Sequence, residues 1–349
     1  MRASLIFSLL MAIVISMVTS RIVYFGFTPN YAADIFSPGV FNHRFDHDVY
    51  KYRVLCKYLL FAIDDWLGNS VPSNTAELRI RINTPSGSER FYYAFYYLNT
   101  IFLALTTIMV VFLVRLGKDY RFSKMEQNLL ILFIPMLIGL SEYVVCVYDV
   151  SSYFFQFLAL YLFIKFYDEE PVFTMITLSA LMIISTLNRE SSALSVSMLG
   201  VLLLTRYGAK KSTLWSLLIL SASFLSTYIG LRYWITNPSD LHIRNLDVGN
   251  YLKTSNLYGF LFWAIFFYLP MAIADTKENR FLIGAFFLFS APYVITCLKD
   301  GVLWEVRLYI PLFLGALFIS KLDTSKQTVR ISELRFGQLR RKLRVKESM

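Results

Sequence analysis

Long apolar segments alternate with short polar segments along most of this chain. Runs of about 20 apolar residues are long enough to cross a bilayer as helices. The pattern therefore predicts an all-α, polytopic transmembrane helical bundle of about ten spans, a number that can shift by one because several segments are short. The predicted spans occupy residues 5–25, 91–114, 129–147, 153–166, 172–187, 193–205, 214–235, 257–274, 281–297 and 302–320.

Composition supports a membrane protein and excludes an ordinary water-soluble domain. Hydrophobic residues make up 56% of the chain, aromatic residues 17%, and the mean hydropathy is +0.52. One water-soluble core could not hide so much apolar surface. No solenoid repeat or low-complexity block is visible. We expect one integral membrane domain over residues 1–320 and a basic cytoplasmic tail over 321–349, with membrane lipids as partners and no nucleic-acid partner.

The charges along the chain predict which ends of the spans face the cytoplasm. With the N-terminus inside, the assigned inner segments hold 20 of the 34 basic residues and ten of the 24 acidic residues. Basic residues near span ends resist translocation, so both termini are expected to be cytoplasmic. The protein is expected to be integral to the cell inner (plasma) membrane. We interpret the first span as a retained helix rather than a cleaved signal peptide, because it lacks a clear cleavage site.

The first outer segment, over residues 28–90, is too long for a simple turn between two spans. Apolar residues recur at helical spacing between Tyr52 and Leu67, while Arg53, Lys57 and Asp64 occupy another face. This pattern predicts an amphipathic helix in the membrane interface, with Trp66 at headgroup depth. The helix is expected to end near Leu67, because Gly68 and Pro72 follow.

A polar cluster, residues 43–48, stands in the same segment just before this helix. Asp46 and Asp48 are candidate general bases, because a carboxylate at an apolar interface can have a raised pKa. Asp48 could instead cap the following helix. His43 and His47 could bind a divalent metal together with the aspartates, such as Mg or Mn, or could hydrogen-bond a phosphate. The alternative for each residue is a solvated loop.

Charged residues also stand at the predicted outer ends of later spans. Arg189 and Glu190 are adjacent, so on a helix they point about 100° apart and are expected to reach different partners. Glu305 and Arg307 are two apart and are likewise expected to diverge. An arginine there could bind a phosphate through its two-pronged guanidinium. The alternative is an internal ion pair that links spans, for example from Arg307 to Glu142 or Glu190.

The order of these parts resembles the GT-C superfamily of integral membrane glycosyltransferases. The likeness rests on a first span, a large outer loop with the Asp46-His47-Asp48 cluster, an interfacial helix and then further spans, and it covers most of the chain to residue 320. The segments 52–55 and 188–190 are also similar to bacterial members. This chain departs from larger members in lacking a soluble C-terminal domain.

The resemblance implies transfer of a sugar from a polyprenyl-phosphate or polyprenyl-diphosphate carrier to a glycan or lipid acceptor on the outer face. The base would be Asp46, or secondly Asp48, and the product would be a cell-surface polysaccharide or lipopolysaccharide. The donor phosphate would bind Arg189, Arg307 and Arg44. The supporting residues would be Glu190, Glu305, Asp149, Tyr52 and Arg53.

Two other functions compete with this interpretation. A polysaccharide polymerase or ligase would also use lipid-diphosphate substrates, but it would depend on outer arginines more than on an aspartate. A transporter or lipid flippase would use charges such as Glu142, Arg189 and Glu305 as a pathway. The three cysteines have no metal-ligand spacing and require no disulfide.

Overall fold

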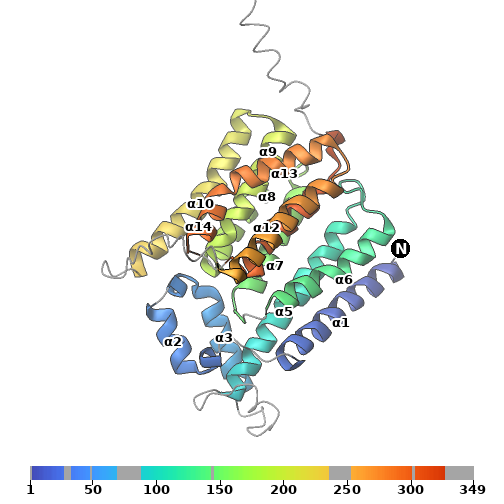
Figure 1. Ribbon diagram of the computed structural model, residues 1–349. Helices are drawn as coiled ribbons and strands as arrows, with labels where there is room; N and C mark the ends of the chain where they lie inside the picture. The colour runs from blue at the N-terminus through green and yellow to red at the C-terminus, as the bar shows by residue number, and fades with distance from the viewer. Residues whose placement is uncertain are drawn as a thin grey trace, which may run out of the picture.

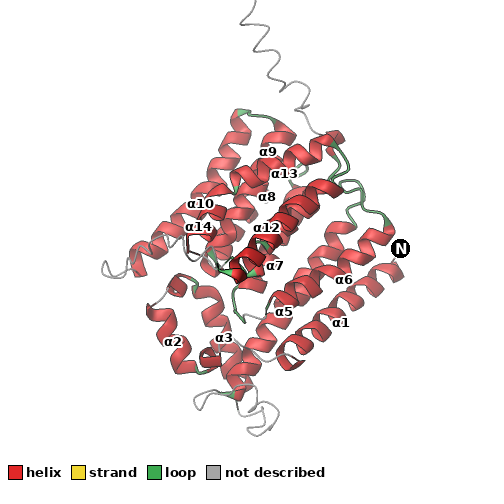
Figure 2. Cartoon of the chain, in the orientation of Figure 1, coloured by secondary structure: helices red, strands yellow, loops and turns green. Residues whose placement is uncertain are grey.

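The computed structural model is all-helical over the residues it describes (Figures 1 and 2). These are residues 2–26, 33–47, 49–68, 88–142, 145–235, 253–300 and 303–326. Within them the side chains at positions 2–3, 33–34, 44, 46–47, 49–50, 300 and 326 are not described. An all-helical fold is what a bilayer requires of a chain that is not a closed barrel, because each helix satisfies its own backbone hydrogen bonds.

The long helices form a bundle, and shorter helices lie at one end of it (Figure 1). The short outer-segment elements are η1 (Ala33–Phe36), α2 (Pro38–His47), η2 (Val49–Tyr52) and α3 (Val54–Leu67). The bundle consists of α1 (Arg2–Gly26), α5 (Glu89–Val114), α6 (Lys124–Ser141), α7 (Asp149–Phe166), α8 (Pro171–Asn188), α9 (Ala193–Tyr207), α10 (Lys211–Ile235), α12 (Thr254–Ile273), α13 (Lys277–Phe289), α14 (Ala291–Asp300) and α15 (Ile310–Ser320). Three short turns complete it, η3 (Glu190–Ser192), η5 (Val306–Leu308) and η6 (Thr324–Lys326).

Every predicted span overlaps at least one helix. Fewer than ten of these helices are long and apolar enough to cross a membrane alone. By length and composition, six described helices qualify, namely α1, α5, α6, α8, α10 and α12. A seventh is counted if α13 and α14, which meet at a 51° bend, form one broken span. The structure thus supports a multi-pass membrane protein and leaves the ten-span count as an expectation.

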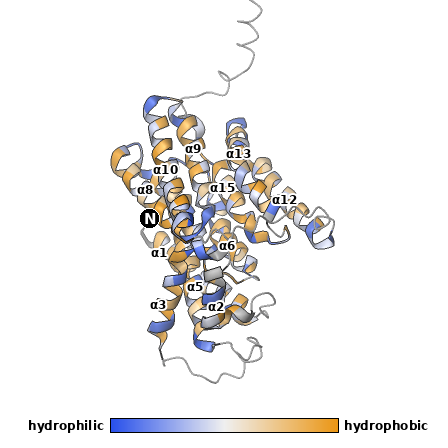
Figure 3. Ribbon diagram, turned by 90° about the vertical axis from the view of Figure 1, so that its left-hand side faces the viewer, coloured by the Kyte–Doolittle hydropathy of each residue, from blue (hydrophilic) through white to orange (hydrophobic). Residues whose placement is uncertain are grey.

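Apolar residues occur along most of the length of the bundle helices (Figure 3), and many of them are exposed rather than buried in the core. On α1, Phe7 is 65% exposed, and on α10 and α12 Ile229 and Leu261 are about equally open, at 59% and 60%. A protein in water rarely exposes apolar residues along whole helices. Hydrocarbon tails would cover these faces in a bilayer.

Local sequence explains several helix ends. Ser123 and Glu126 form a reciprocal capping box at the start of α6, and Ser88 caps α5 by accepting a hydrogen bond from the Phe91 amide.

Two helix boundaries differ from the predicted spans. α6 ends at Ser141, although the apolar pattern predicts helix to residue 147. α15 begins at Ile310, so the first part of the predicted span 302–320 is not regular α-helix.

The outer segment differs from its prediction in one respect and agrees with it in another. The polar cluster is not a loop, because residues 43–47 lie within α2. A helix is present as α3 where the pattern predicts one, and it ends at Leu67, as expected, before Gly68 with a φ of 48°. The N-cap of α3 is Arg53, and Asp48 lies outside the described residues.

The predicted outward face of α3 is partly buried. Asp64 is 3% exposed and accepts hydrogen bonds from Arg90 at 2.8 and 3.0 Å, and Arg53 is 8% exposed. In contrast, Trp66 and Tyr58 are 79% and 71% exposed. The helix therefore packs its apolar stripe and two charges against the bundle while it presents aromatic side chains outward.

Candidate functional site

A buried cluster of charged residues lies where several elements meet at the end of the bundle next to α3. Arg53 precedes α3, Asp149 is the first residue of α7, and Arg189 follows the last residue of α8. Glu190 begins η3, directly after Arg189. Glu305 and Arg307 come from the irregular segment around η5. We call these residues the outer charge network, after the face on which the predicted topology places them: Arg53, Asp149, Arg189, Glu190, Glu305 and Arg307.

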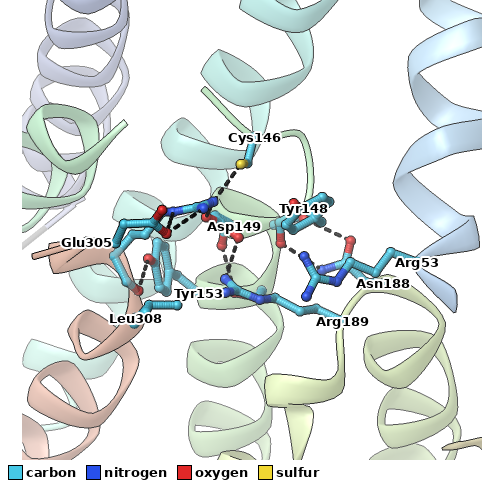
Figure 4. A network of polar contacts seen from close by, with 12 residues as sticks. Arg53, Cys146, Tyr148, Asp149, Tyr153, Asn188, Arg189, Glu305 and Leu308 are labelled. Carbon is cyan, nitrogen blue, oxygen red and sulfur yellow. Dashed lines mark hydrogen bonds and ion pairs between the residues drawn. The ribbon is translucent and has the colours of Figure 1, made fainter. Parts of the chain in front are cut away.

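Asp149 is the centre of the outer charge network (Figure 4). Its side chain is fully buried, and it pairs with Arg189 through one oxygen and with Arg307 through the other, at 2.7 Å. A buried carboxylate is strongly destabilising unless it is paired, so two arginines around one aspartate account for its burial. α7, α8 and η5 are thereby tied together at this end.

Arg307 uses all three of its guanidinium nitrogens. Its Nε and Nη2 donate to Oε2 of Glu305 at 3.0 and 2.7 Å, and its Nη1 donates to Asp149 at 2.7 Å and to Sγ of Cys146 at 2.5 Å. The Tyr153 hydroxyl also donates to the backbone carbonyl of Arg307, at 3.2 Å. Arg307 is therefore held on every side by hydrogen bonds.

The pairing of Glu305 with Arg307 contradicts the prediction that they diverge. That prediction assumed a helix through both residues, but Glu305 has φ −74° and ψ 91° and only the short turn η5 follows it. An extended residue before the turn allows two side chains two positions apart to meet. Arg307 does form an internal ion pair with another part of the bundle, but its partner there is Asp149 rather than Glu142 or Glu190. Arg189 and Glu190 reach separate partners, as predicted.

Arg53 joins α3 to the turn after α8. Its guanidinium donates through Nε to Glu190 at 3.0 Å and makes a second, shorter bond through Nη2. It also lies over the Tyr148 ring, 4.1 Å from the ring centroid. Burial alone would raise the pKa of the Glu190 carboxyl, but the neighbouring Arg53 outweighs it and lowers the pKa from 4.5 to about 2.

Neutral polar groups surround the charges. The Asn188 side chain donates to the Tyr148 carbonyl at 3.1 Å and accepts from the hydroxyl of Ser151 at 2.9 Å and from the thiol of Cys56 at 2.8 Å. These bonds fix the segment before α7 against the end of α8. Cys56, Cys146 and Cys297 are all buried, and none of them forms a disulfide bond.

Two polar residues next to this cluster were missed by the sequence interpretation. Asn99 on α5 is buried and donates to the Tyr24 hydroxyl at 2.6 Å and to the Cys146 carbonyl at 3.0 Å. Tyr148 carries two arginines near its ring, Arg53 and Arg189. A single asparagine within an apolar span was the available signal for Asn99, whereas Tyr148 looks like any other aromatic residue in this tyrosine-rich chain.

Glu142, at the end of α6, is buried beside this cluster. One of its oxygens accepts a long hydrogen bond from the Cys146 amide, at 3.4 Å. The other, Oε1, has no hydrogen-bond partner in the described part of the chain. Glu142 is thus a buried acid beside the network rather than the partner of Arg307.

The candidate bases lie only partly within the described structure. The backbones of Arg44, Asp46 and His47 belong to α2, but their side chains are not described, and Asp48 lies outside the described residues. His43 is exposed. The structure therefore does not describe where the carboxyl groups of Asp46 and Asp48 lie relative to the three arginines.

Tyr52 lies in η2, and the guanidinium of Arg232, near the end of α10, stands 4.6 Å from the centroid of its ring. Tyr52 therefore contacts α10, whereas Arg53 contacts η3 and the residue before α7. In the described part of the chain, no three or more histidine, cysteine or acidic side chains are placed to hold a metal ion. The side chains of Asp46 and His47 are not among those described.

The opposite end of the bundle is built differently. Lys321, after α15, pairs with Glu126 at 2.9 Å and with Asp275 at 2.8 Å, while Arg121 pairs with Asp323 at 2.7 Å. These pairs are partly exposed and join helix ends in the manner of ordinary surface ion pairs. A small cavity there, lined in part by Asp119 and Arg206, lies away from the outer charge network.

The arrangement combines three arginines with three carboxylates in a buried setting, beside helices that present aromatic side chains outward. Such a site can hold an anion by exchanging one carboxylate partner for another oxygen ligand.

The chain was compared with protein-family models, curated proteins and solved structures, and no family model, curated protein or solved structure matches it.

Proposed function

We propose that this protein is a membrane glycosyltransferase that moves a sugar from a polyprenyl-phosphate or polyprenyl-diphosphate carrier to a glycan or lipid acceptor. The observation that supports it best is the position of the outer charge network. Three arginines from chain-distant elements meet around Asp149 at the end of the bundle that also carries α2 and α3. A lipid phosphate needs cationic hydrogen-bond donors at the membrane surface, and the three arginines are such donors, each facing a carboxylate of the network.

The division of labour follows from the chemistry of the transfer. The acceptor hydroxyl needs a base, for which Asp46 is the first candidate and Asp48 the second. The departing phosphate needs positive charge that is already in place, which the network offers. His43 and His47, in the same segment, could bind a divalent metal such as Mg or Mn.

This proposal includes a topology. Ten spans with both termini in the cytoplasm of the inner membrane would place α2, α3 and the network on the outer face. The excess of basic residues in the opposite segments supports that orientation. The exposed aromatic side chains of α3 support a position in the membrane interface.

A polysaccharide polymerase or ligase is the second candidate, and one observation favours it. The described part of the site is dominated by arginines, and Asp149, its most buried carboxylate, is occupied by two of them. An enzyme that relies on arginines rather than on an aspartate base would have this bias. A transporter or lipid flippase remains the candidate from another class, using Glu142, Arg189 and Glu305 as charges on a pathway.

The direct test separates an enzyme from a transporter. The purified protein is placed in detergent with polyprenyl-phosphate sugars labelled in the sugar, together with glycan and lipid acceptors. We expect label to appear on an acceptor and polyprenyl phosphate to be released, with no gradient or sealed vesicle present. An absence of transfer in detergent, combined with flux of the same lipids across sealed proteoliposomes, would refute the proposal.

A further inference from the structure

The three arginines of the outer charge network are not equivalent. Arg307 donates through Nε, Nη1 and Nη2 to three different residues, and Arg53 donates through Nε and Nη2 to Glu190. Arg189 forms an ion pair with Asp149 through Nη1, but within the described structure neither Nη1 nor Nε makes a directed hydrogen bond. Its donors are close to a carboxylate but are not directed at it.

Burial makes this difference important. Arg189 is only 4% exposed, so water cannot freely satisfy those donors. A buried donor without an acceptor costs about 1–3 kcal/mol, and more when the group is charged. Such a cost in a native structure calls for an explanation, and an anion that arrives during function is one.

The surroundings of Arg189 fit an anion with several oxygens. Arg189 is in extended conformation, with φ −163° and ψ 142°, at the point where α8 ends and η3 begins. Nη1 faces Oδ1 of Asp149 in their ion pair, so Nε is the donor left for a ligand. A phosphate oxygen could therefore accept a hydrogen bond from Nε while Nη1 keeps its ion pair with Asp149. The adjacent Glu190 side chain is 37% exposed, so the network reaches the surface one residue away.

We infer that Arg189 is the phosphate-contacting residue of this site, and that Arg307 is a positioning residue that fixes Asp149 and η5. The inference rests on the proposed function for its ligand, the phosphate group of a lipid carrier. It revises the expectation that Arg189 and Arg307 bind the phosphate together. Four of the five N–H groups of Arg307 already donate to Glu305, Asp149 and Cys146, so it has far less donor capacity for a ligand.

The test measures binding rather than transfer, so it can fail independently of the proposed function. The full-length protein in detergent is titrated with a polyprenyl monophosphate, with the uncharged polyprenol, and with inorganic phosphate. The variants are Arg189→Gln and the matched Arg307→Gln, with Arg189→Lys and Arg307→Lys as substitutes where a glutamine variant does not fold. The readout is the preference for phosphate over alcohol at the same lipid tail, which a purely structural role would not change.

We expect Arg189→Gln to reduce the preference for the phosphate by roughly tenfold or more, the scale of a charge-assisted hydrogen bond. Arg307→Gln should keep most of that preference while it lowers the melting temperature, because it leaves Asp149 and Glu305 short of a cation. Wild-type preference in Arg189→Gln, or loss of preference in Arg307→Gln with an unchanged melting temperature, would overturn the assignment. Binding of inorganic phosphate without the lipid would show that a lipid headgroup is the wrong source. Transfer that is absent while Arg189-dependent binding persists would count against the proposed function alone.

Discussion

At the scale of single residues, the pairing of charges at this end depends on backbone conformation as much as on spacing. Arg189 and Glu190 reach different partners, as predicted, although Arg189 is extended rather than helical, because adjacent side chains diverge both on a helix and in an extended segment. The same argument was wrong for Glu305 and Arg307, because Glu305 is extended and lies outside a helix. No periodicity in the sequence marks that residue as extended.

The identities of the charged residues were readable from the sequence, but their partners were not. Arg53, Asp149 and Arg307 stand out in an apolar chain, since charges near a membrane are costly unless they are paired or functional. Which carboxylate meets which arginine depends on the packing of helices that are far apart in sequence. Arg53 and Glu190, for example, are separated by 137 positions.

The ion pair of Arg53 and Glu190 makes a prediction about pH. Because the folded-state pKa of Glu190 is about 2, below its ordinary value of 4.5, the ionised carboxylate stabilises the protein fully above about pH 4.5. That stabilisation is lost as the pH falls from 4.5 toward 2. Since 37% of the Glu190 side chain is exposed, we expect a modest effect, from a few tenths to about 1 kcal/mol.

The measurement is the melting temperature against pH for the wild-type protein and Glu190→Gln in detergent. The variant should melt lower at pH 7, and the difference should shrink as the pH approaches 2. Glu169→Gln, at an exposed acid on the turn after α7, serves as the control and should match wild type throughout. A difference between wild type and Glu190→Gln that is constant across the whole range would contradict the assigned pKa.

At the scale of elements, apolar periodicity predicted where helices occur better than where they end or which face they bury. α3 appears where the pattern placed a helix, but Arg53 and Asp64 turn inward because Glu190 and Arg90 satisfy them. A pattern of polar and apolar residues cannot distinguish a charge facing solvent from a charge with a buried partner. The bend between α13 and α14 was likewise hidden within one apolar segment, residues 281–297.

The number of spans is the element-scale prediction that most needs a test, because α7, α9 and α15 are not among the helices that qualify on their own. If all ten segments cross, Trp66→Cys on α3 should face outward, while Glu169→Cys and Lys210→Cys should face the cytoplasm. In intact cells an impermeant thiol reagent should label only the first, and all three should react after the membrane is opened. The natural cysteines are buried and give a low background.

Labelling of Glu169→Cys or Lys210→Cys in intact cells would contradict the ten-span topology. It would also remove the argument that the basic segments are cytoplasmic. An endogenous cytoplasmic protein in the same sample serves as the control for leaky cells. Equal labelling at all three sites counts against the topology only where that cytoplasmic protein stays unlabelled.

At the scale of the whole molecule, the sequence was sufficient to predict a helical, multi-pass membrane protein. Apolar length and composition determine this class, because only helices and closed barrels satisfy the backbone in lipid. The meeting of α3, α7, α8 and η5 around Asp149 could not be predicted, since it depends on how the spans pack side by side. The place of Asp46 relative to that meeting point stays a prediction.

The central claim is that a carboxylate in the outer segment acts as the base of a lipid-linked sugar transferase. Its most direct measurement compares the initial rate of transfer for wild type, Asp46→Asn and the double variant Asp46→Asn with Asp48→Asn. Asp65→Asn, at an exposed acid of α3, is the matched control and should retain the wild-type rate. We predict a loss of about 10²- to 10⁴-fold for the double variant, the usual contribution of general-base catalysis. A double variant that transfers sugar at the wild-type rate, while Arg189→Ala abolishes transfer, would contradict the claim and favour the arginine-dependent polymerase or ligase.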